Sequence, residues 1–274
     1  MDASRRRHAL GQNFLIDRSV ASHALDLARL PAATPVLEIG PGHGALTDVL
    51  LEAGHEVFAV EIDSELAAKL AARGDPALHI EQADFLRLPI EDIPARFRFV
   101  VANLPYSSGT AIVSRLVSAM GRFDRLVVLL QREVAERLAA GPGSRAYGAL
   151  SVLTALGAEV RLGPIVPPTA FRPQPKVESA LVRLDCRAQV PESVKNLSAF
   201  RLVVRGSFGQ RRKVLRNALT SALGRDRALA CLEISAIDGG RRAETLSFDE
   251  FALLAQAASG LLAGTLVETA DPGS

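Results

Sequence analysis

The sequence predicts a doubly wound α/β domain followed by a smaller, all-helical C-terminal domain. Short apolar runs, which are typical of buried strands, alternate with helical segments from about residue 36 to residue 140. Strand-like runs then disappear after about Asp185, and four helical segments follow. The length of 274 residues is sufficient for two unequal domains with a sizeable core. We therefore expect domains at residues 1–186 and 187–274.

The first domain is expected to contain at least five strands, each ending in a glycine or a polar residue. They are expected at residues 36–39, 56–62, 78–83, 99–102 and 125–130. Four helices are expected at residues 45–53, 65–73, 110–120 and 133–140. Asp63 or Ser64 is expected to cap the second of these helices. The apolar runs at residues 152–160 and 179–184 are candidates for the last two strands.

The charge of the chain is distributed unevenly between the two predicted domains. The net charge is only +2, but residues 201–242 carry ten Lys and Arg against three acidic residues. That stretch therefore has a charge of +7 and leaves the rest of the chain at −5. It overlaps the first three of the four helices expected in the C-terminal domain, at residues 192–205, 211–223, 227–234 and 248–262. A basic surface of this kind is typical of phosphate binding, so the C-terminal domain is expected to bind nucleic acid, with an affinity that falls steeply with salt.

Several classes of protein are excluded or disfavoured by composition. The longest strongly apolar run, Leu126–Leu130, is far shorter than the roughly 20 residues of a membrane-spanning helix. The N-terminal residues lack the apolar core of a signal peptide. Two cysteines and five histidines show no metal-ligand spacing, so we expect a cytoplasmic protein without a metal. Motifs for a P-loop and for a nucleophile elbow are absent.

A glycine-rich loop, Glu38–Gly44, follows the first predicted strand and opens a helix. Glycines allow a ligand to approach the backbone closely, although such a loop alone is a weak signal. Glu61 strengthens it, because it lies 21 residues after Gly40 at the end of the next strand. A carboxylate at that position accepts hydrogen bonds from ribose hydroxyls. The alternative is a tight turn with a surface glutamate.

The glycine spacing favours S-adenosylmethionine over a dinucleotide. A dinucleotide fingerprint requires a third glycine further along than Gly44. The acidic Glu38 would repel a pyrophosphate but suits the ammonium group of a methionine. Asp84, at the end of the third strand, is placed to accept from an adenine amino group. We therefore expect a Rossmann-like domain that binds S-adenosylmethionine.

The element Asn103-Leu104-Pro105-Tyr106 ends the fourth strand, beside the expected methyl-donor site. The amino group of adenine is a poor nucleophile because its lone pair is delocalised into the ring. Two acceptors aimed at its N–H bonds, the Asn103 side-chain carbonyl and the Leu104 backbone carbonyl, would release that lone pair. Pro105 would hold the turn rigid, and Tyr106 would stack on the base. The alternative is an ordinary turn with a packed tyrosine.

Taken together, nine stretches resemble the ribosomal RNA adenine N6,N6-dimethyltransferases. The resemblance extends from about residue 8 to residue 255. The matching stretches are Leu10–Asp17, Val36–Thr47, Glu61–Asp63, Ala83–Phe85, Val101–Tyr106, Tyr147–Gly148, Phe171–Ser179, Phe208–Lys213 and Leu215–Asn217. The bacterial members dimethylate two adjacent adenosines in a hairpin loop near the 3′ end of 16S rRNA. The resemblance therefore implies a 16S rRNA enzyme that acts on the small (30S) ribosomal subunit.

The resemblance also implies which residues form the two binding sites. The implied donor site consists of Asn13, Leu15, Gly40, Gly42, Glu61, Ile62, Asp84 and Asn103. The implied target-base site consists of Asn103, Leu104, Pro105, Tyr106 and Phe171. Phe171 would close on the second face of the flipped adenine. The alternative is that Phe171 is a core aromatic, but Pro173 and Pro175 indicate that this segment is a loop instead. The sequence departs from the family at His43 and at Ser107-Ser108, which affects substrate positioning and removes no catalytic group.

Three alternatives to this function remain at the level of sequence. One is a non-catalytic assembly factor that binds immature small subunits through the basic domain. Another is the sister family that methylates 23S rRNA and confers macrolide resistance, although Asn13-Phe14-Leu15 and Phe208–Lys213 favour the 16S enzymes. The third is a nicotinamide oxidoreductase. We expect a monomer.

Overall fold

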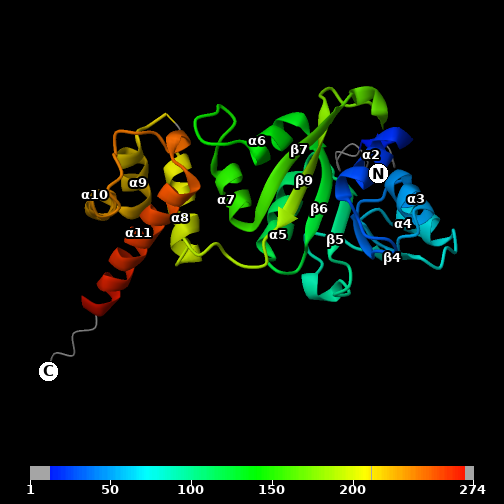
Figure 1. The fold of residues 1–274 in the computed structure, drawn as a ribbon, viewed down its shortest axis with the longest axis horizontal. Helices are drawn as coiled ribbons and strands as arrows, with labels where there is room; N and C mark the ends of the chain where they lie inside the picture. Colours follow the sequence, from blue (N-terminus) through cyan, green and yellow to red (C-terminus); the bar gives the residue numbers. More distant parts are fainter. Residues whose placement is uncertain (1–12, 211, 269–274) are drawn as a thin grey trace. The chain divides into compact units, whose positions relative to one another are not determined.

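The computed structural model describes residues 13–210 and 212–268, and it divides into two compact units (Figure 1). The first unit contains the chain up to Ala139 together with Gly157–Gln189. The second contains residues 140–156 together with the chain from Val190 onward. Residues 140–156, which the sequence places in the first domain, therefore group with the helical unit.

The first unit is built on a seven-stranded sheet with the order β4-β3-β2-β5-β6-β9-β7. Its strands are β2 (Val36–Ile39), β3 (Val57–Glu61), β4 (Leu78–Gln82), β5 (Phe99–Asn103), β6 (Arg125–Gln131), β7 (Ala158–Val166) and β9 (Ser179–Cys186). The first five are parallel to one another, and β9 pairs antiparallel with both β6 and β7. Chain order reverses between β2 and β5, and a ligand site is expected there, at the carboxyl ends of the strands.

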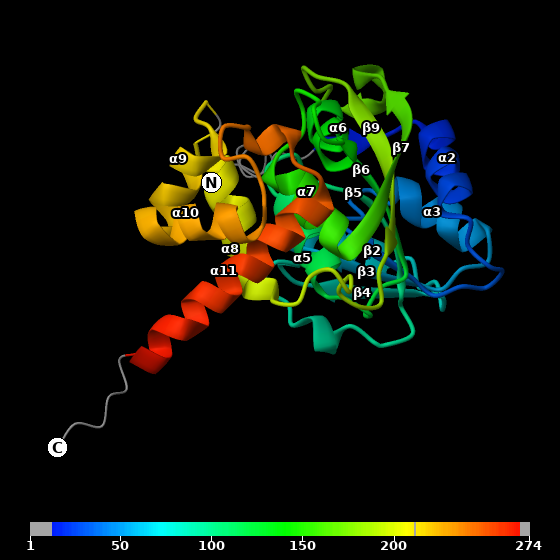
Figure 2. The same ribbon diagram turned by 60° about the vertical axis from the view of Figure 1, so that its left-hand side comes forward.

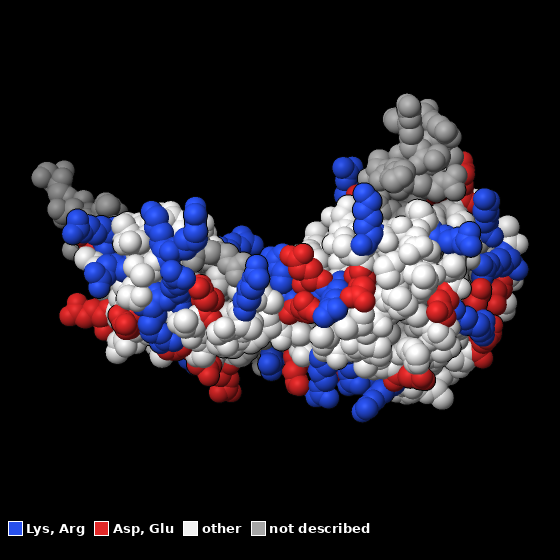
Figure 3. Space-filling model, turned by 90° about the horizontal axis from the view of Figure 1, so that it is seen from above, with Lys and Arg blue, Asp and Glu red and all other residues white. Residues whose placement is uncertain are grey.

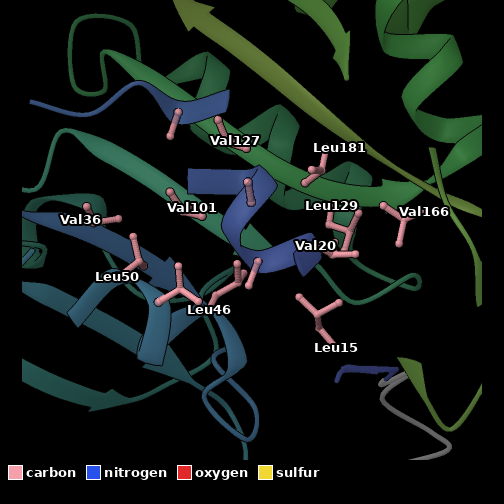
Figure 4. Packing of buried hydrophobic residues seen from close by; sticks show 14 of the residues in the cluster. Leu15, Val20, Val36, Leu46, Leu50, Val101, Val127, Leu129, Val166 and Leu181 are labelled. Carbon is pink, nitrogen blue, oxygen red and sulfur yellow. The ribbon is translucent and has the colours of Figure 1, made fainter. Parts of the chain in front are cut away.

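Helices cover both faces of this sheet (Figure 2). They are α2 (Arg18–Ala28), α3 (Ala45–Glu52), α4 (Ser64–Ala71), α5 (Gly109–Ser118) and α6 (Arg132–Ala139). A buried cluster joins α2 and α3 to one face of the sheet through Val127, Leu129 and Leu181 (Figure 4). Leu130 points to the opposite face, where it lies against Gly109 of α5. The predicted doubly wound α/β domain is confirmed.

Most predicted elements are present with ends shifted by a few residues, and Asp63 caps α4 as expected. The strand expected at residues 152–160 is wrong. Residues Ala149–Gly157 form the helix α7, and the strand β7 begins only at Ala158. A short apolar run fits a buried helix as well as a strand, and Val152 and Leu156 are both buried at a spacing of four.

The sequence reading also missed the N-terminal elements. The helix α2 begins after Asp17, whose side chain accepts from the Ser19 amide. A two-stranded sheet pairs β1 (Phe14–Leu15) antiparallel with β8 (Phe171–Arg172). The three short 3-10 helices are Ile90–Asp92, Pro168–Ala170 and Ala243–Thr245.

The second unit is helical, as predicted. Besides the first eight residues of α7 it contains α8 (Leu197–Phe208), α9 (Leu215–Leu223), α10 (Arg225–Ile234) and α11 (Phe248–Glu268). Phe208 packs between Tyr147 and Phe251 in its core. Lys and Arg side chains gather on the face of this unit that Figure 3 presents. Among the described residues, no helix has the length and apolar character that crossing a membrane requires.

Candidate active site

The glycine loop connects β2 to α3 at the point where the strand order reverses. Gly40, Gly42 and Gly44 all have positive φ angles, which side chains larger than hydrogen rarely permit. A Cβ atom on Gly42 would lie 2.8 Å from the Phe14 ring. The loop therefore needs glycine at this position both for its backbone and for the close approach of β1.

Glu61 anchors this loop from the end of β3. Its carboxylate accepts from the Gly42 amide at 3.0 Å and from the Asp63 amide at 2.9 Å. The side chain is only 1% exposed, and its burial raises the pKa of Glu61. The alternative of a surface glutamate is therefore wrong. Each carboxylate oxygen has a second lone pair in addition to the one that these amides use.

Glu38 lies beneath the loop and is equally buried. The Thr47 hydroxyl donates to its carboxyl group at 2.7 Å. Burial raises the pKa of Glu38 to about 8, so the carboxyl is predominantly neutral at pH 7. The group lines a small cavity together with Phe14, Gly40, Gly42 and Asn103. A cationic ligand group in that cavity would favour the ionised carboxylate.

A second cavity, of about 190 Å³, shares Gly40 with the first. Its polar wall includes Asp84, whose carboxylate accepts from the Leu86 amide at 2.9 Å. Its apolar wall includes Ile62, which is 43% exposed, and Leu86. An exposed apolar side chain at a strand end is suited to cover a flat ring. Ile62 and Asp84 were both expected at the donor site, and the structure brings them together.

The sequence reading missed part of this cavity wall. Phe85, Leu86, Ser107 and Ile112 line it, although Phe85 belongs to one of the family stretches. The signal that could have found the first two is their place directly after Asp84, at a strand end. Arg115 of α5 holds this loop by donating to the carbonyls of Phe85 and Leu88.

Asn103 ends β5 beside the small cavity. Its side-chain nitrogen donates to the Asn13 carbonyl at 3.0 Å. A carbonyl only accepts hydrogen bonds, so the amide nitrogen must face Asn13 and the side-chain oxygen must point elsewhere. The following residue, Leu104, donates its amide to the Leu129 carbonyl and is buried. The N-terminal segment therefore holds the Asn103 side chain, and β6 holds the Leu104 backbone.

Tyr106 is held by a hydrogen bond of 2.6 Å between its hydroxyl and that of Ser179. Ser179, the first residue of β9, is completely buried. Partial burial raises the pKa of Tyr106, so the phenol remains protonated at neutral pH. The ring is thus fixed at both ends, by the chain after Pro105 and by β9.

The sequence matches one known family over almost the whole chain. A family model described as "Ribosomal RNA adenine dimethylase" matches residues 3–259. The chain belongs to this family of ribosomal RNA adenine dimethylases. The fold class and the enzyme class expected from the sequence are thereby confirmed, and the nicotinamide oxidoreductase is excluded.

This dimethylase aligns with named relatives over nearly the full length of both proteins. The chain is 46% identical over 257 residues to "Ribosomal RNA small subunit methyltransferase A" of Syntrophotalea carbinolica. The aligned region covers 92% of this chain and 96% of the relative. The protein of the same name from Geobacter sulfurreducens is 45% identical and covers 96% and 97%.

Two solved structures are also similar. A dimethyladenosine transferase from Plasmodium falciparum is 26% identical, with a TM-score of 0.74 over 88% of this chain and 95% of that one. The 23S rRNA methyltransferase ErmE is 27% identical, with a TM-score of 0.67 over 90% and 100%.

Phe171 of this dimethylase is buried in the core. It belongs to β8, opposite Leu15 of β1, and its side chain is 1% exposed within the core cluster. The expected loop is thus a short strand at this residue, and the burial fits the alternative of a core aromatic. Leu15 is also part of this core cluster, and it lines the small cavity together with Glu38 and Asn103.

The two departures from the family pattern are accommodated locally. The His43 ring packs against Phe14 with their centroids 4.4 Å apart, so it extends the cover that β1 provides over the loop. Ser107 and Ser108 line the larger cavity. Within the described parts of the chain, no three His, Cys, Asp or Glu side chains come together as a metal site. Residues 10–12 and Arg211 of the family stretches lie outside the described residues.

Proposed function

We propose that the chain transfers methyl groups from S-adenosylmethionine to the N6 atoms of two adjacent adenosines in a 3′-terminal hairpin loop of 16S rRNA, within the 30S subunit. The observation that carries this proposal is the position of Asn103-Leu104-Pro105-Tyr106 directly beside the glycine loop and its two cavities. The relatives named small subunit methyltransferases support the choice of 16S rRNA. Action as a monomer in the cytoplasm stays a prediction.

The residues around Gly40 fit S-adenosylmethionine, whose methionine and adenosine ends require two different environments. Glu38 would hold the ammonium group in the small cavity, and Glu61 would accept from the ribose hydroxyls. Asp84 and Ile62 would hold the adenine in the larger cavity, with Gly40 between them. When bound there, this donor supplies a methyl group on a positively charged sulfur.

The target adenine would be held at the other side of Asn103. The Asn103 side-chain oxygen and the Leu104 carbonyl would accept from its two N6 hydrogens and release the nitrogen lone pair. Tyr106 would stack on the ring, and its hydrogen bond to Ser179 keeps the ring in place. The methylated amine is cationic and loses its proton readily, so no strong base is required. Unpairing a base is least costly in a loop, which favours a hairpin-loop target.

The helical unit would bind rRNA through its basic residues. Arg205, Arg212, Lys213 and Arg216 are exposed on or between α8 and α9. Contacts of this kind go to phosphates and give affinity without sequence preference. Recognition of the particular adenosines would then depend on the first unit.

Replacement of Gly42 by alanine is expected to weaken binding of S-adenosylmethionine by about tenfold or more. The new methyl group would be strained at a φ of +60° and would lie 2.8 Å from Phe14. Either the loop or β1 would have to move away from the donor site. Isothermal titration calorimetry measures the affinity directly. The control is Gly54→Ala: Gly54 also has a positive φ, but nothing lies near its Cβ position, and it lies outside the site. Equal affinity of Gly42→Ala and the unmodified protein would contradict the expected role of the loop.

The proposed function is tested by incubating unmethylated 30S subunits with the protein and S-adenosylmethionine. Digestion of the 16S rRNA followed by mass measurement should reveal N6,N6-dimethyladenosine at two adjacent positions. A parallel incubation with 50S subunits tests the 23S rRNA alternative, to which the similarity with ErmE gives weight. Binding to 30S subunits without any methylation would instead establish the non-catalytic assembly factor.

A further inference from the structure

Gln131 occupies the carboxyl end of β6, next to the strand that carries Asn103. In the β5–β6 ladder Asn103 is paired with Leu129, so Gln131 lies two residues further along the same strand. In the β6–β9 ladder Gln131 is paired with Ser179. Gln131 therefore lies between the strand that ends in Asn103 and the residue that holds Tyr106.

The side chain of Gln131 faces the same side of the sheet as these groups. Leu129 and Leu181 both contribute to the core cluster on the α2 side (Figure 4), and side chains two residues apart on a strand share a face. Gln131 and Ser179 follow this alternation and form a directly opposed pair, whose Cβ atoms in such ladders are about 4.5–5.5 Å apart. Because Ser179 contacts the Tyr106 hydroxyl, that hydroxyl also lies on this face.

The Gln131 amide has no hydrogen-bond partner among the described residues, although its side chain is partly buried. A glutamine amide carries two N–H donors and a carbonyl acceptor. Of its neighbours on the same face, Ser179 bonds to the Tyr106 hydroxyl, and the Asn103 nitrogen donates to the Asn13 carbonyl. Gln131 thus places a polar side chain at the carboxyl end of the inner strand β6, where its N–H donors and its carbonyl are available to a ligand.

We propose that Gln131 is a specificity residue that donates a hydrogen bond to a ring nitrogen of the target adenine, N1 or N7. The inference rests on the proposed function, in which Asn103 and Leu104 hold N6 of the same base. Both ring nitrogens lie near N6 and accept hydrogen bonds, and a glutamine amide is a good donor to the adenine edge. A donor at N1 would also reject guanine, whose N1 carries a hydrogen.

The test is a cycle that combines enzyme variants with base analogues. Gln131→Met keeps the length of the side chain without its polar atoms. The substrates are 30S subunits reconstituted with 16S rRNA that carries adenosine, 1-deazaadenosine or 7-deazaadenosine at the target position. The kcat/KM for methyl transfer is measured for each pair. Intrinsic changes in N6 reactivity affect both enzymes equally and cancel in the ratio.

Gln131→Met is expected to lower kcat/KM on adenosine by about tenfold, the effect of one well-formed hydrogen bond. On one of the two deaza analogues the variant and the unmodified enzyme should react equally, and that analogue identifies the nitrogen. Gln189→Met, an exposed loop residue of the same unit, is the control and should react normally on all substrates.

The inference is overturned if both analogues slow the two enzymes by the same factor, or if Gln131→Met methylates adenosine at the normal rate. If Gln131→Met does not fold, Gln131→Glu, which has no N–H donor, is used for the same cycle. Failure of the unmodified enzyme to methylate adenosine would overturn the proposed function itself, so the two failures are distinguishable.

Discussion

Alanine in place of Asn103 is expected to lower the rate of methyl transfer by about 10²–10³-fold, the usual cost of removing one preorganised group that stabilises a developing charge. The Asn103 side-chain oxygen would accept a hydrogen bond from the N6 amino group. The side-chain nitrogen already donates to the Asn13 carbonyl. Backbone atoms and carboxylates account for most of the expected donor contacts. The affinity for S-adenosylmethionine should therefore fall much less than the rate.

Single-turnover methylation of 30S subunits measures the rate of Asn103→Ala, and calorimetry measures donor affinity. Thr110→Ala, an exposed position on the adjoining helix α5, is the matched control and should change neither quantity. Methylation by Asn103→Ala at the normal rate would show that the side chain does not act on the target amine. A loss of donor binding as large as the loss of rate would assign Asn103 to the donor site alone.

Alanine in place of Phe171 is expected to lower the free energy of unfolding by about 3–5 kcal/mol. The ring is buried in the cluster that joins β1, β8 and α2 to the sheet, and its removal leaves a cavity there. Urea denaturation followed by circular dichroism measures this loss. The matched control is Phe123→Ala, because Phe123 is equally buried but lies just before β6, at the opposite end of the sheet from Asn103.

The two roles considered for Phe171 give different outcomes in this pair. If Phe171 acts only in the core, both variants should lose stability to a similar extent and retain methylation per folded molecule. If the ring also stacks on the target base, Phe171→Ala alone should lose about 1–3 kcal/mol of binding to the base, seen as a higher KM for 30S subunits. An unchanged stability of Phe171→Ala would contradict the structure, since no core residue of this size is removed without cost.

Local sequence patterns determined much of this fold. Four of the five parallel strands, β2, β3, β5 and β6, are largely apolar runs that lead into a helix, as at Asp63 before α4. The edge strand β4 is the exception, with His79, Glu81 and Gln82 among its five residues. Positive φ angles at Gly40 and Gly42 could be expected from the loop alone. These features depend on neighbours within a few residues, which is why they can be read without a structure.

Other features required the tertiary structure, because they depend on which distant segments meet. The apolar run at residues 152–160 is compatible with a helix or with a strand. Only packing in the folded protein decides that it contains the end of α7 and the start of β7. Pairing of β1 with β8 placed Phe171 in the core, although two prolines shortly after it suggested a loop. Periodicity cannot reveal a contact between segments more than 150 residues apart.

The candidate site shows the same division. Sequence alone determined that Gly40, Glu61, Asp84 and Asn103 lie at strand ends, because the order of strands and polar residues is local. Only the tertiary structure decided what holds them: Asn13 orients Asn103, Ser179 holds Tyr106, and burial raises the pKa of Glu38 and Glu61. Hydrogen bonds and desolvation are set by groups that approach in space, and a linear pattern of residue types carries no information about that approach.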